Sequence, residues 1–150
     1  MLRIAIATDH AGLSLKESLR IWLQETHEVE DFGTHTSDSM DYPDTGLAAA
    51  GAVGNGTCEC GILICGSGLG MSIVGNKVPG VRAALCHTRE YAVLSRQHNN
   101  ANVLVLAGRF IAPHYARQIV TDWLNTPFEG DRHQKRIDKI TQYETTRGAQ

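Results

Sequence analysis

Short apolar runs alternate along the chain with segments whose apolar residues recur three or four positions apart. Arg3–Thr8, Gly61–Cys65 and Val103–Ala107 are predominantly apolar, which is typical of strands buried on both faces of a sheet. Leu13–Glu25 carries its apolar residues on one helical face instead. The pattern predicts two more strands, at Val29–Phe32 and Val81–Cys86, and five more helices, at Asp44–Val53, Leu69–Lys77, Thr88–His98, Ala112–Asn125 and His133–Tyr143.

Strands that alternate with helices predict a single α/β domain over residues 1–150. We expect a Rossmann-like, parallel five-stranded sheet with helices on both faces. No internal repeat and no low-complexity linker divides the chain. The last helix, from about residue 133, has no strand after it, so we expect it to pack on a partner subunit. Such sheets bind ligands beyond the carboxyl ends of their strands, and the candidate chemistry is expected there.

The charge balance narrows the possible partners. Charged residues make up 20% of the 150 residues and the formal net charge is −2, which argues against a nucleic-acid protein held by a general basic field. No apolar run reaches the roughly 18 residues that a membrane helix needs, and no leader pattern precedes the first strand. We therefore expect a cytoplasmic protein with no membrane and no nucleic-acid partner.

The four cysteines are expected to stay reduced in the cytoplasm, as core residues, metal ligands or catalytic groups. Cys58 and Cys60 have a spacing that suggests a metal site. However, Cys60 and Cys65 lie at opposite ends of one extended run, roughly 16 Å apart, and no paired His spacing completes a site around Cys58. We therefore expect no metal.

A glycine-rich loop follows the third predicted strand, and its sequence is Cys65-Gly66-Ser67-Gly68-Leu69-Gly70. Gly66, Gly68 and Gly70 allow backbone N–H groups to turn inward at the start of a helix, which makes a nest for an anion. A dinucleotide site is a poor alternative, because the spacing is G-x-G-x-G and Cys86 ends the next strand where an acidic residue would be expected. A Walker loop is excluded because no Gly-Lys-Ser/Thr follows.

Cys65 ends the apolar strand and faces the amino end of the next helix. That position favours a thiolate, because the helix dipole stabilises negative charge there. An isolated buried Cys is more often a small core residue. Beside an anion nest, the catalytic interpretation is the better of the two.

Polar residues also follow the other strands or end the helices beside them, and nearly all of them are expected to share the carboxyl edge of the sheet. His10 follows the first strand and Arg109 the fifth, while Arg132 and Arg136 are four apart on the last helix. Guanidinium groups suit phosphate, although a solvated helix face is a common alternative for the last two. A nest of N–H groups together with an arginine site predicts a phosphorylated sugar that passes through an enediolate.

In these residues the chain resembles ribose-5-phosphate isomerase type B, within the group that also holds the galactose-6-phosphate isomerase subunits. The resemblance runs from about residue 4 to about residue 140. It rests on Asp9–Gly12, Leu15-Lys16, Asp31–Thr34, Asp41–Asp44, Ile64–Gly70, Gly75–Ala83, Ser95–Asn99, and on Arg132, His133 and Arg136.

The resemblance implies a cofactor-free aldose–ketose isomerase of D-ribose 5-phosphate and D-ribulose 5-phosphate. It also implies a homodimer with its active site at the subunit interface. Cys65 would be the base that moves a proton between C1 and C2, the loop Gly66–Gly70 would bind the enediolate, and His98 would assist ring opening. The remaining implied contacts are Asp9 and Ser67 near the sugar oxygens, Tyr42 and Asn99 on the substrate, and His10, Arg109, Arg132 and Arg136 on the phosphate.

A second branch of that family lacks the cysteine and has a Glu just after the glycine loop. Met71 stands there in this chain, which places the chain in the cysteine branch. Asn100 replaces the usual Asp near His98, and Asp131 replaces the usual Gly beside the phosphate arginines. Two alternatives remain open. One is the same chemistry on a hexose 6-phosphate, such as allose or galactose 6-phosphate, and the other is a phosphate- or nucleotide-binding module without catalysis.

Overall fold

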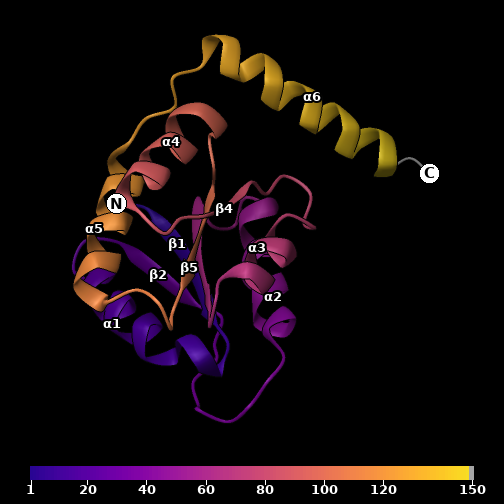
Figure 1. Cartoon of the computed structure of the whole chain (residues 1–150). Coiled ribbons are helices and arrows are strands. Elements are labelled where there is room, and N and C mark those ends of the chain that lie inside the picture. Colours follow the sequence, from indigo (N-terminus) through magenta and orange to yellow (C-terminus); the bar gives the residue numbers. More distant parts are fainter. Residues whose placement is uncertain (149–150) are drawn as a thin grey trace.

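The computed structural model describes residues 1–148 and shows a five-stranded parallel sheet between two layers of helices (Figure 1). The strand order is β2-β1-β3-β5-β4. The predicted Rossmann-like α/β fold is confirmed. The strands are β1 (Arg3–Thr8), β2 (Glu28–Asp31), β3 (Cys60–Cys65), β4 (Ala83–Leu85) and β5 (Val103–Ala107).

Helices cover both faces of the sheet, because successive strand residues point to opposite faces and those on each face are apolar. In β1, Ile4 and Ile6 pack in the core shared with α1, α4 and α5, whereas Ala5 and Ala7 pack in the core shared with α2 and α3. The helices are α1 (Leu13–Leu23), α2 (Tyr42–Gly54), α3 (Leu69–Gly75), α4 (Arg89–Asn99), α5 (Pro113–Asn125) and α6 (Asp131–Gly148), with a 3-10 turn η1 at His10–Gly12.

Most boundaries lie within one or two residues of the predicted ones, and three of the differences have a clear description. α2 begins at Tyr42, two residues early, because Pro43 fits the first turn of a helix. β4 covers only the middle of Val81–Cys86, because it is an edge strand that pairs with β5 alone. α6 is longer than predicted at both ends.

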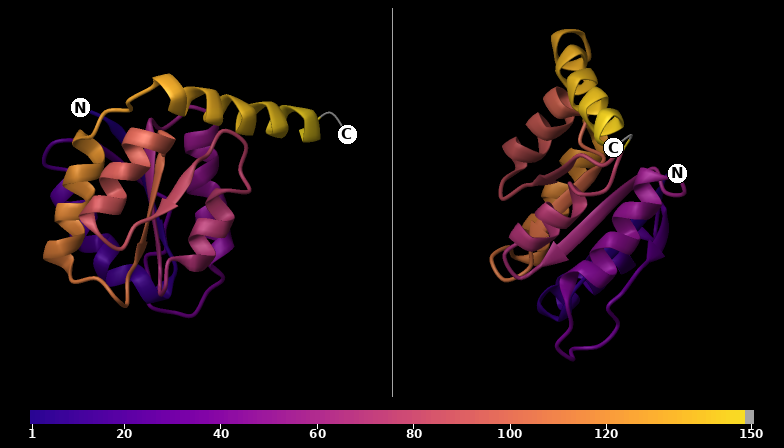
Figure 2. Two further views of the ribbon diagram at one scale, coloured as in Figure 1. Left: turned by 45° about the horizontal axis from the view of Figure 1, so that its top comes forward. Right: turned by 90° about the vertical axis from the view of Figure 1, so that its right-hand side faces the viewer.

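The last helix, α6, crosses one end of the sheet and extends beyond the body of the protein (Figure 2). His133 and Ile137 of its first turns are buried, whereas Ile140 and Tyr143 are 52% and 62% exposed. An amphipathic helix with apolar residues left in solvent has a face that its own chain does not cover. None of the helices within residues 1–148 is long and apolar enough to cross a membrane.

The strand order creates a switch point between β1 and β3. The chain leaves β1 toward β2 on one side of the sheet, and it leaves β3 toward β4 and β5 on the other. The loops after these two central strands therefore diverge and leave a crevice at their carboxyl ends. This crevice holds the candidate site.

Candidate active site

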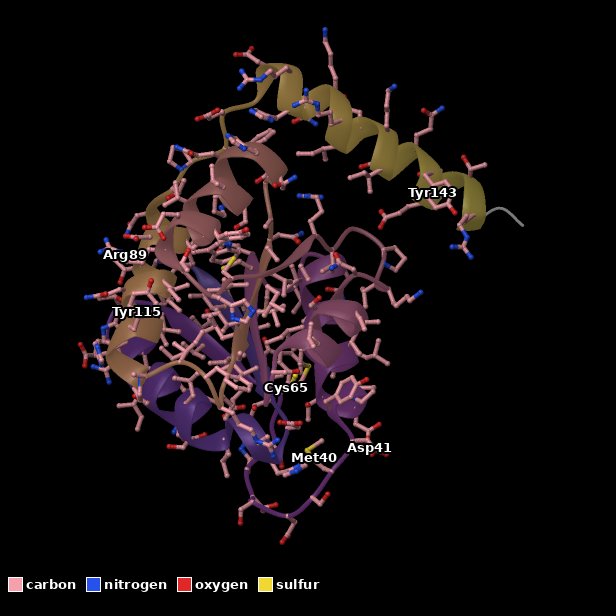
Figure 3. All side chains as sticks on the ribbon, in the orientation of Figure 1. Met40, Asp41, Cys65, Arg89, Tyr115 and Tyr143 are labelled. Atoms are coloured by element: carbon pink, nitrogen blue, oxygen red, sulfur yellow. The ribbon has the colours of Figure 1, made fainter. Side chains whose placement is uncertain are left out.

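A cleft of about 430 Å³ opens at the switch point. It is formed by the segments that follow β1, β3 and β5, together with the start of α2. Figure 3 shows Cys65 at the end of β3, on the side of the molecule where Met40 and Asp41 of the β2–α2 loop lie. The lining residues are Asp9, His10, Ala11, Tyr42, Cys65, Gly66, Ser67, Gly70, Arg109 and Phe110.

Cys65 differs from the other three cysteines in its surroundings. It is 5% exposed and lines the cleft. Burial raises the pKa of Cys60 to about 12, and burial raises the pKa of Cys58 and of Cys86 to about 11. Those three are therefore neutral core thiols at physiological pH. Met71, at the position of the alternative Glu, is fully buried and does not line the cleft.

The glycine loop reaches its shape because position 68 excludes a side chain. Gly68 has φ of 77°, and a Cβ there would come 2.4 Å from the Leu85 side chain. α3 then begins at Leu69, so the N–H groups of its first turn have no acceptor within the helix. Ser67 Oγ accepts a hydrogen bond from the Leu69 N–H at 3.3 Å. The loop thus leaves backbone N–H groups at the start of α3, next to Cys65, where the sequence predicts an anion nest.

Two polar side chains lie directly on the glycines of this loop. A Cβ at Gly66 would come 3.3 Å from Cδ, Nε and Nη1 of Arg109, so the guanidinium packs against this glycine. A Cβ at Gly70 would come 2.7 Å from the ring of Tyr42. The absence of side chains at these two glycines therefore lets the Arg109 guanidinium and the Tyr42 ring pack against the loop at the cleft.

The segment after β1 supplies Asp9 and His10. Asp9 is 7% exposed, and its Oδ1 accepts a hydrogen bond from the Ala11 N–H at 3.0 Å. His10 Nδ1 accepts one from the Met40 N–H at 3.2 Å. That bond occupies one ring nitrogen and leaves Nε2 as the nitrogen available to a ligand.

Lys16 fixes the loop that carries Met40, a role that the sequence alone did not reveal. Its ammonium group is fully buried and donates to both carboxylate oxygens of Asp31, at 2.9 and 2.7 Å, and to the Thr34 carbonyl at 2.9 Å. The Thr34 N–H in turn donates to the Thr8 carbonyl at 2.9 Å. A buried ion pair with further hydrogen bonds ties the β2–α2 loop to the end of β1.

Four of the predicted site residues lie elsewhere, namely His98, Asn99, Arg132 and Arg136. α4 runs back along the sheet, so its last turn lies at the amino edge, where the Asn99 carbonyl accepts a hydrogen bond from Arg82 Nε at 3.2 Å. α6 begins beside that turn (Figure 1). The length of β3, roughly 16 Å, separates this edge from Cys65. The expectation of one shared edge is therefore wrong within a single chain.

The two departures from the usual family residues both fall in left-handed backbone. Asn100 has φ of 45° and ends α4, where its Oδ1 also accepts a hydrogen bond from Arg96 at 3.1 Å. Asp131 has φ of 46°. Glycine adopts such a conformation most easily and Asn tolerates it, which explains why Gly is usual at position 131.

Phe110 also lines the cleft and was not among the predicted residues. Its side chain is 76% exposed, directly after Arg109. The only signal in the sequence is that position, because a single aromatic residue after a strand has no distinctive pattern.

Comparisons with known proteins agree with this arrangement. The sequence model of the family described as Ribose/Galactose Isomerase matches residues 4–140. The ribose-5-phosphate isomerase B of Escherichia coli is 44% identical over 98% of this chain and 99% of its own length. The D-erythrulose-4-phosphate isomerase of Pectobacterium atrosepticum is 41% identical over 96% of both chains.

A solved structure shows the same fold. Ribose-5-phosphate isomerase B of Clostridium thermocellum superimposes with a TM-score of 0.94 at 47% identity, covering 97% of this chain and 99% of that one. The similarity in sequence and the similarity in fold therefore both extend over nearly the whole length of the chain. The chain belongs to the Ribose/Galactose Isomerase family.

Proposed function

We propose that this protein interconverts D-ribose 5-phosphate and D-ribulose 5-phosphate without a cofactor, with Cys65 as the base. The observation that carries the proposal is the cleft itself. It holds an acid–base group, a backbone anion nest, and the cationic Arg109 within one cavity at the strand ends. Relatives of the same family that bear this activity in their names, at 44% and 47% identity, support it.

In this mechanism the Cys65 thiolate removes the C2 proton of the open-chain aldose and the C1 carbonyl oxygen becomes an oxyanion. The proton of the C2 hydroxyl moves to the C1 oxygen. The enediolate then receives at C1 the proton held by Cys65, or one from solvent, and the C2 oxygen becomes the ketose carbonyl. Backbone N–H groups of the loop Gly66–Gly70 stabilise the developing oxyanion, and removing one such donor typically costs about 10²–10³ in rate. Asp9 and Ser67 contact the sugar oxygens. The hydrogen moves as a proton, so no redox group is required.

The phosphate contacts explain why the protein would act as a homodimer. Within one chain, only His10 and Arg109 of the phosphate set reach the cleft, whereas Arg132 and Arg136 are exposed at the opposite edge. In the proposed dimer, each cleft receives these two arginines, His98 and Asn99 from its partner, and a symmetric dimer completes two sites in this way.

Exposed apolar side chains support such an interface. Leu69 and Ile73 are 61% and 60% exposed, and both belong to α3, the helix that begins beside the cleft. Ile140 and Tyr143 of α6 are also exposed. Large apolar residues left in solvent on these two helices are typical of surfaces that a partner covers. We further propose a cytoplasmic location, where the four unpaired cysteines stay reduced.

A coupled assay of the purified protein across four-, five- and six-carbon aldose and ketose phosphates tests this function. We expect the highest kcat/KM with ribose 5-phosphate and ribulose 5-phosphate. A clear preference for a tetrose phosphate, as the name of the Pectobacterium relative suggests, or for a hexose 6-phosphate would correct the substrate. An absence of turnover on all of them, with phosphate still bound, would instead identify a binding module.

Gly70→Ala is expected to weaken substrate binding through Tyr42. The added methyl would come 2.7 Å from the Tyr42 ring and displace it from the loop. We expect KM for ribulose 5-phosphate to rise by roughly fivefold, corresponding to the loss of a contact of about 1 kcal/mol. Steady-state kinetics would measure this.

Gly51→Ala is the matched control, because a Cβ at that α2 position meets nothing within 4 Å. An unchanged KM in Gly70→Ala would show that the position of Tyr42 does not matter to substrate binding.

A further inference from the structure

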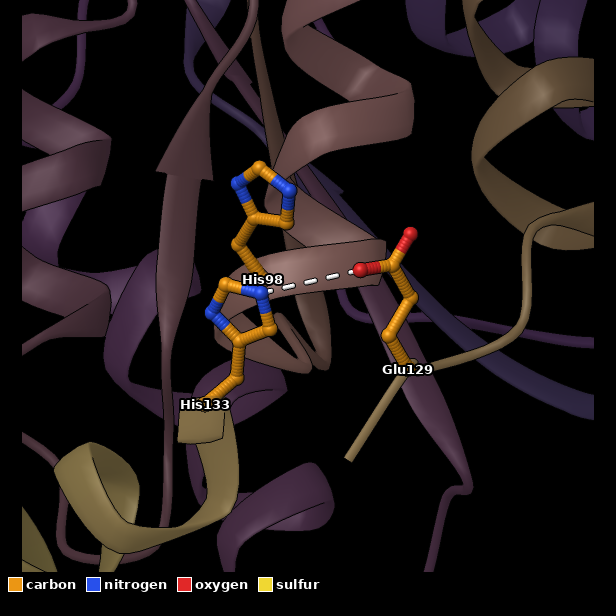
Figure 4. A group of neighbouring side chains, drawn as sticks. All are labelled: His98, Glu129 and His133. Carbon is orange, nitrogen blue, oxygen red and sulfur yellow. Dashed lines mark ion pairs between the residues drawn. The ribbon is translucent and has the colours of Figure 1, made fainter. Parts of the chain in front are cut away.

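His133 lies beside the predicted phosphate arginines, yet the structure gives it a different environment. It is 5% exposed, whereas its neighbours Arg132 and Arg136 on α6 are exposed to solvent. Its ring stacks on the ring of His98, with centroids 4.3 Å apart and planes 11° from parallel (Figure 4). The two arginines can reach a ligand, while the histidine between them faces inward onto another side chain.

Backbone hydrogen bonds hold the segment that carries His133 against the end of α4, which carries His98. The His133 N–H donates to the Gly130 carbonyl at 2.9 Å, and the Glu129 N–H donates to the Gln97 carbonyl of α4 at 3.1 Å. Ile137, one turn further along α6, is also buried. The segment that enters α6 is thus fixed to the last turn of α4, which keeps the backbone of His133 beside His98.

A metal site is the first alternative for this group, because ligand atoms of His98, Glu129 and His133 all lie within 4.8 Å of one another. A shared ion would have to lie about 2.0–2.1 Å from a nitrogen of each ring, close to the plane of both. Nitrogen lone pairs point outward in the ring plane, and two nearly parallel planes do not meet at such a distance. The stacked geometry therefore does not fit coordination of one ion by both rings.

The charge state of His133 also favours a supporting role. Burial lowers the pKa of His133 below its usual 6.5, and the nearby charges of Arg132, His98 and Arg136 act in the same direction, against Glu129. Its Nε2 is buried without a hydrogen-bond partner among the described residues, and the closest carboxylate oxygen, of Glu129, is 3.6 Å away. A neutral buried ring is poorly suited to bind a phosphate.

We propose that His133 is a positioning residue that fixes the ring plane of His98 for sugar ring opening. The proposal rests on the proposed function, in which His98 acts at the ring oxygen of ribose 5-phosphate. One face of the His98 ring is covered by His133, so its rotation about the Cβ–Cγ bond is restricted, while the residue as a whole is only half-buried. His133 itself touches neither substrate nor reacting atom.

Two substitutions separate this role from phosphate binding. His133→Phe keeps a flat ring on His98 but removes both nitrogens, whereas His133→Ala removes the stack. Ring opening is needed only from ribose 5-phosphate, because ribulose 5-phosphate cannot close a furanose ring. We expect His133→Ala to lower the saturating initial rate from ribose 5-phosphate about tenfold more than the rate from ribulose 5-phosphate, since small misplacements of a catalytic group are costly. We expect His133→Phe to retain most of the initial rate from ribose 5-phosphate that His133→Ala loses.

The references are the wild type and His98→Asn. The proposed function fails if the wild type turns over neither substrate. The inference fails if the wild type is active but His133→Ala slows both directions equally, or if the folded Phe variant is as slow as the Ala variant. It also fails if KM and inhibition by inorganic phosphate are what change, because His133 would then be a phosphate ligand. In the His98→Asn background, His133→Ala should have no additional effect on the directional ratio.

Discussion

Replacing Cys65 with Ala is expected to abolish isomerisation in both directions. The substitution removes the group that accepts the C2 proton, and no other acid–base side chain ends β3 at the glycine loop. General acid–base groups contribute about 10²–10⁴ to rate, and here one group performs both proton transfers, so the loss is expected at or above the upper end of that range. Initial rates from ribose 5-phosphate and from ribulose 5-phosphate measure it.

Cys86→Ala serves as the control, because Cys86 is a buried thiol of the opposite core with a raised pKa. We expect it to retain near-normal turnover. Binding of inorganic phosphate should persist in Cys65→Ala, since His10 and Arg109 are unchanged. Near-normal turnover by Cys65→Ala would remove Cys65 from the mechanism and require another base in the cleft.

Two inactive variants are expected to restore activity when they share a dimer. Cys65→Ala removes the base from the cleft, and the double variant Arg132→Ala/Arg136→Ala removes the phosphate contacts that the partner is proposed to supply. A hybrid dimer has one site with both defects and one site with neither. Random pairing of equal amounts makes half of the dimers hybrid, so the mixture should reach about a quarter of wild-type activity at limiting substrate.

Coexpression of the two variants with different tags gives this mixture, and the hybrid purified from it should reach about half of wild-type activity. Each variant mixed with itself is the control. If activity in the hybrid does not exceed the sum of the two parents, the arginines serve the cleft of their own chain, or none. In that case the position of α6 would have to change in solution to bring them there.

The sheet was predictable because its three central strands, β1, β3 and β5, are buried on both faces. Continuous apolar runs such as Gly61–Cys65 leave little ambiguity, and β1 and β5 coincide with their predicted ranges. The ends of elements were less predictable where tertiary context decides them. β4 is short because it is an edge strand, and α6 gains residues beyond its apolar pattern. Neither effect can be read from the spacing of apolar residues along the chain.

The chemistry of the site was more predictable than its location. The glycine loop, Cys65, His10 and Arg109 follow strands directly, and parallel strands bring their carboxyl ends together. His98 ends a helix rather than a strand, and a returning helix ends at the other edge. Lys16 illustrates a second limit, because a buried lysine in an ion pair looks the same in sequence as a solvated one.

A crystal structure of the Cys65→Ala variant with ribulose 5-phosphate tests the shared site most directly. C1 and C2 of the sugar are expected next to residue 65, with their oxygens facing the loop Gly66–Gly70. The phosphate should lie between Arg109 of one subunit and Arg132 and Arg136 of the other. A phosphate bound in the glycine loop with C1 and C2 remote from residue 65, or a sugar contacted by one chain alone, would contradict it.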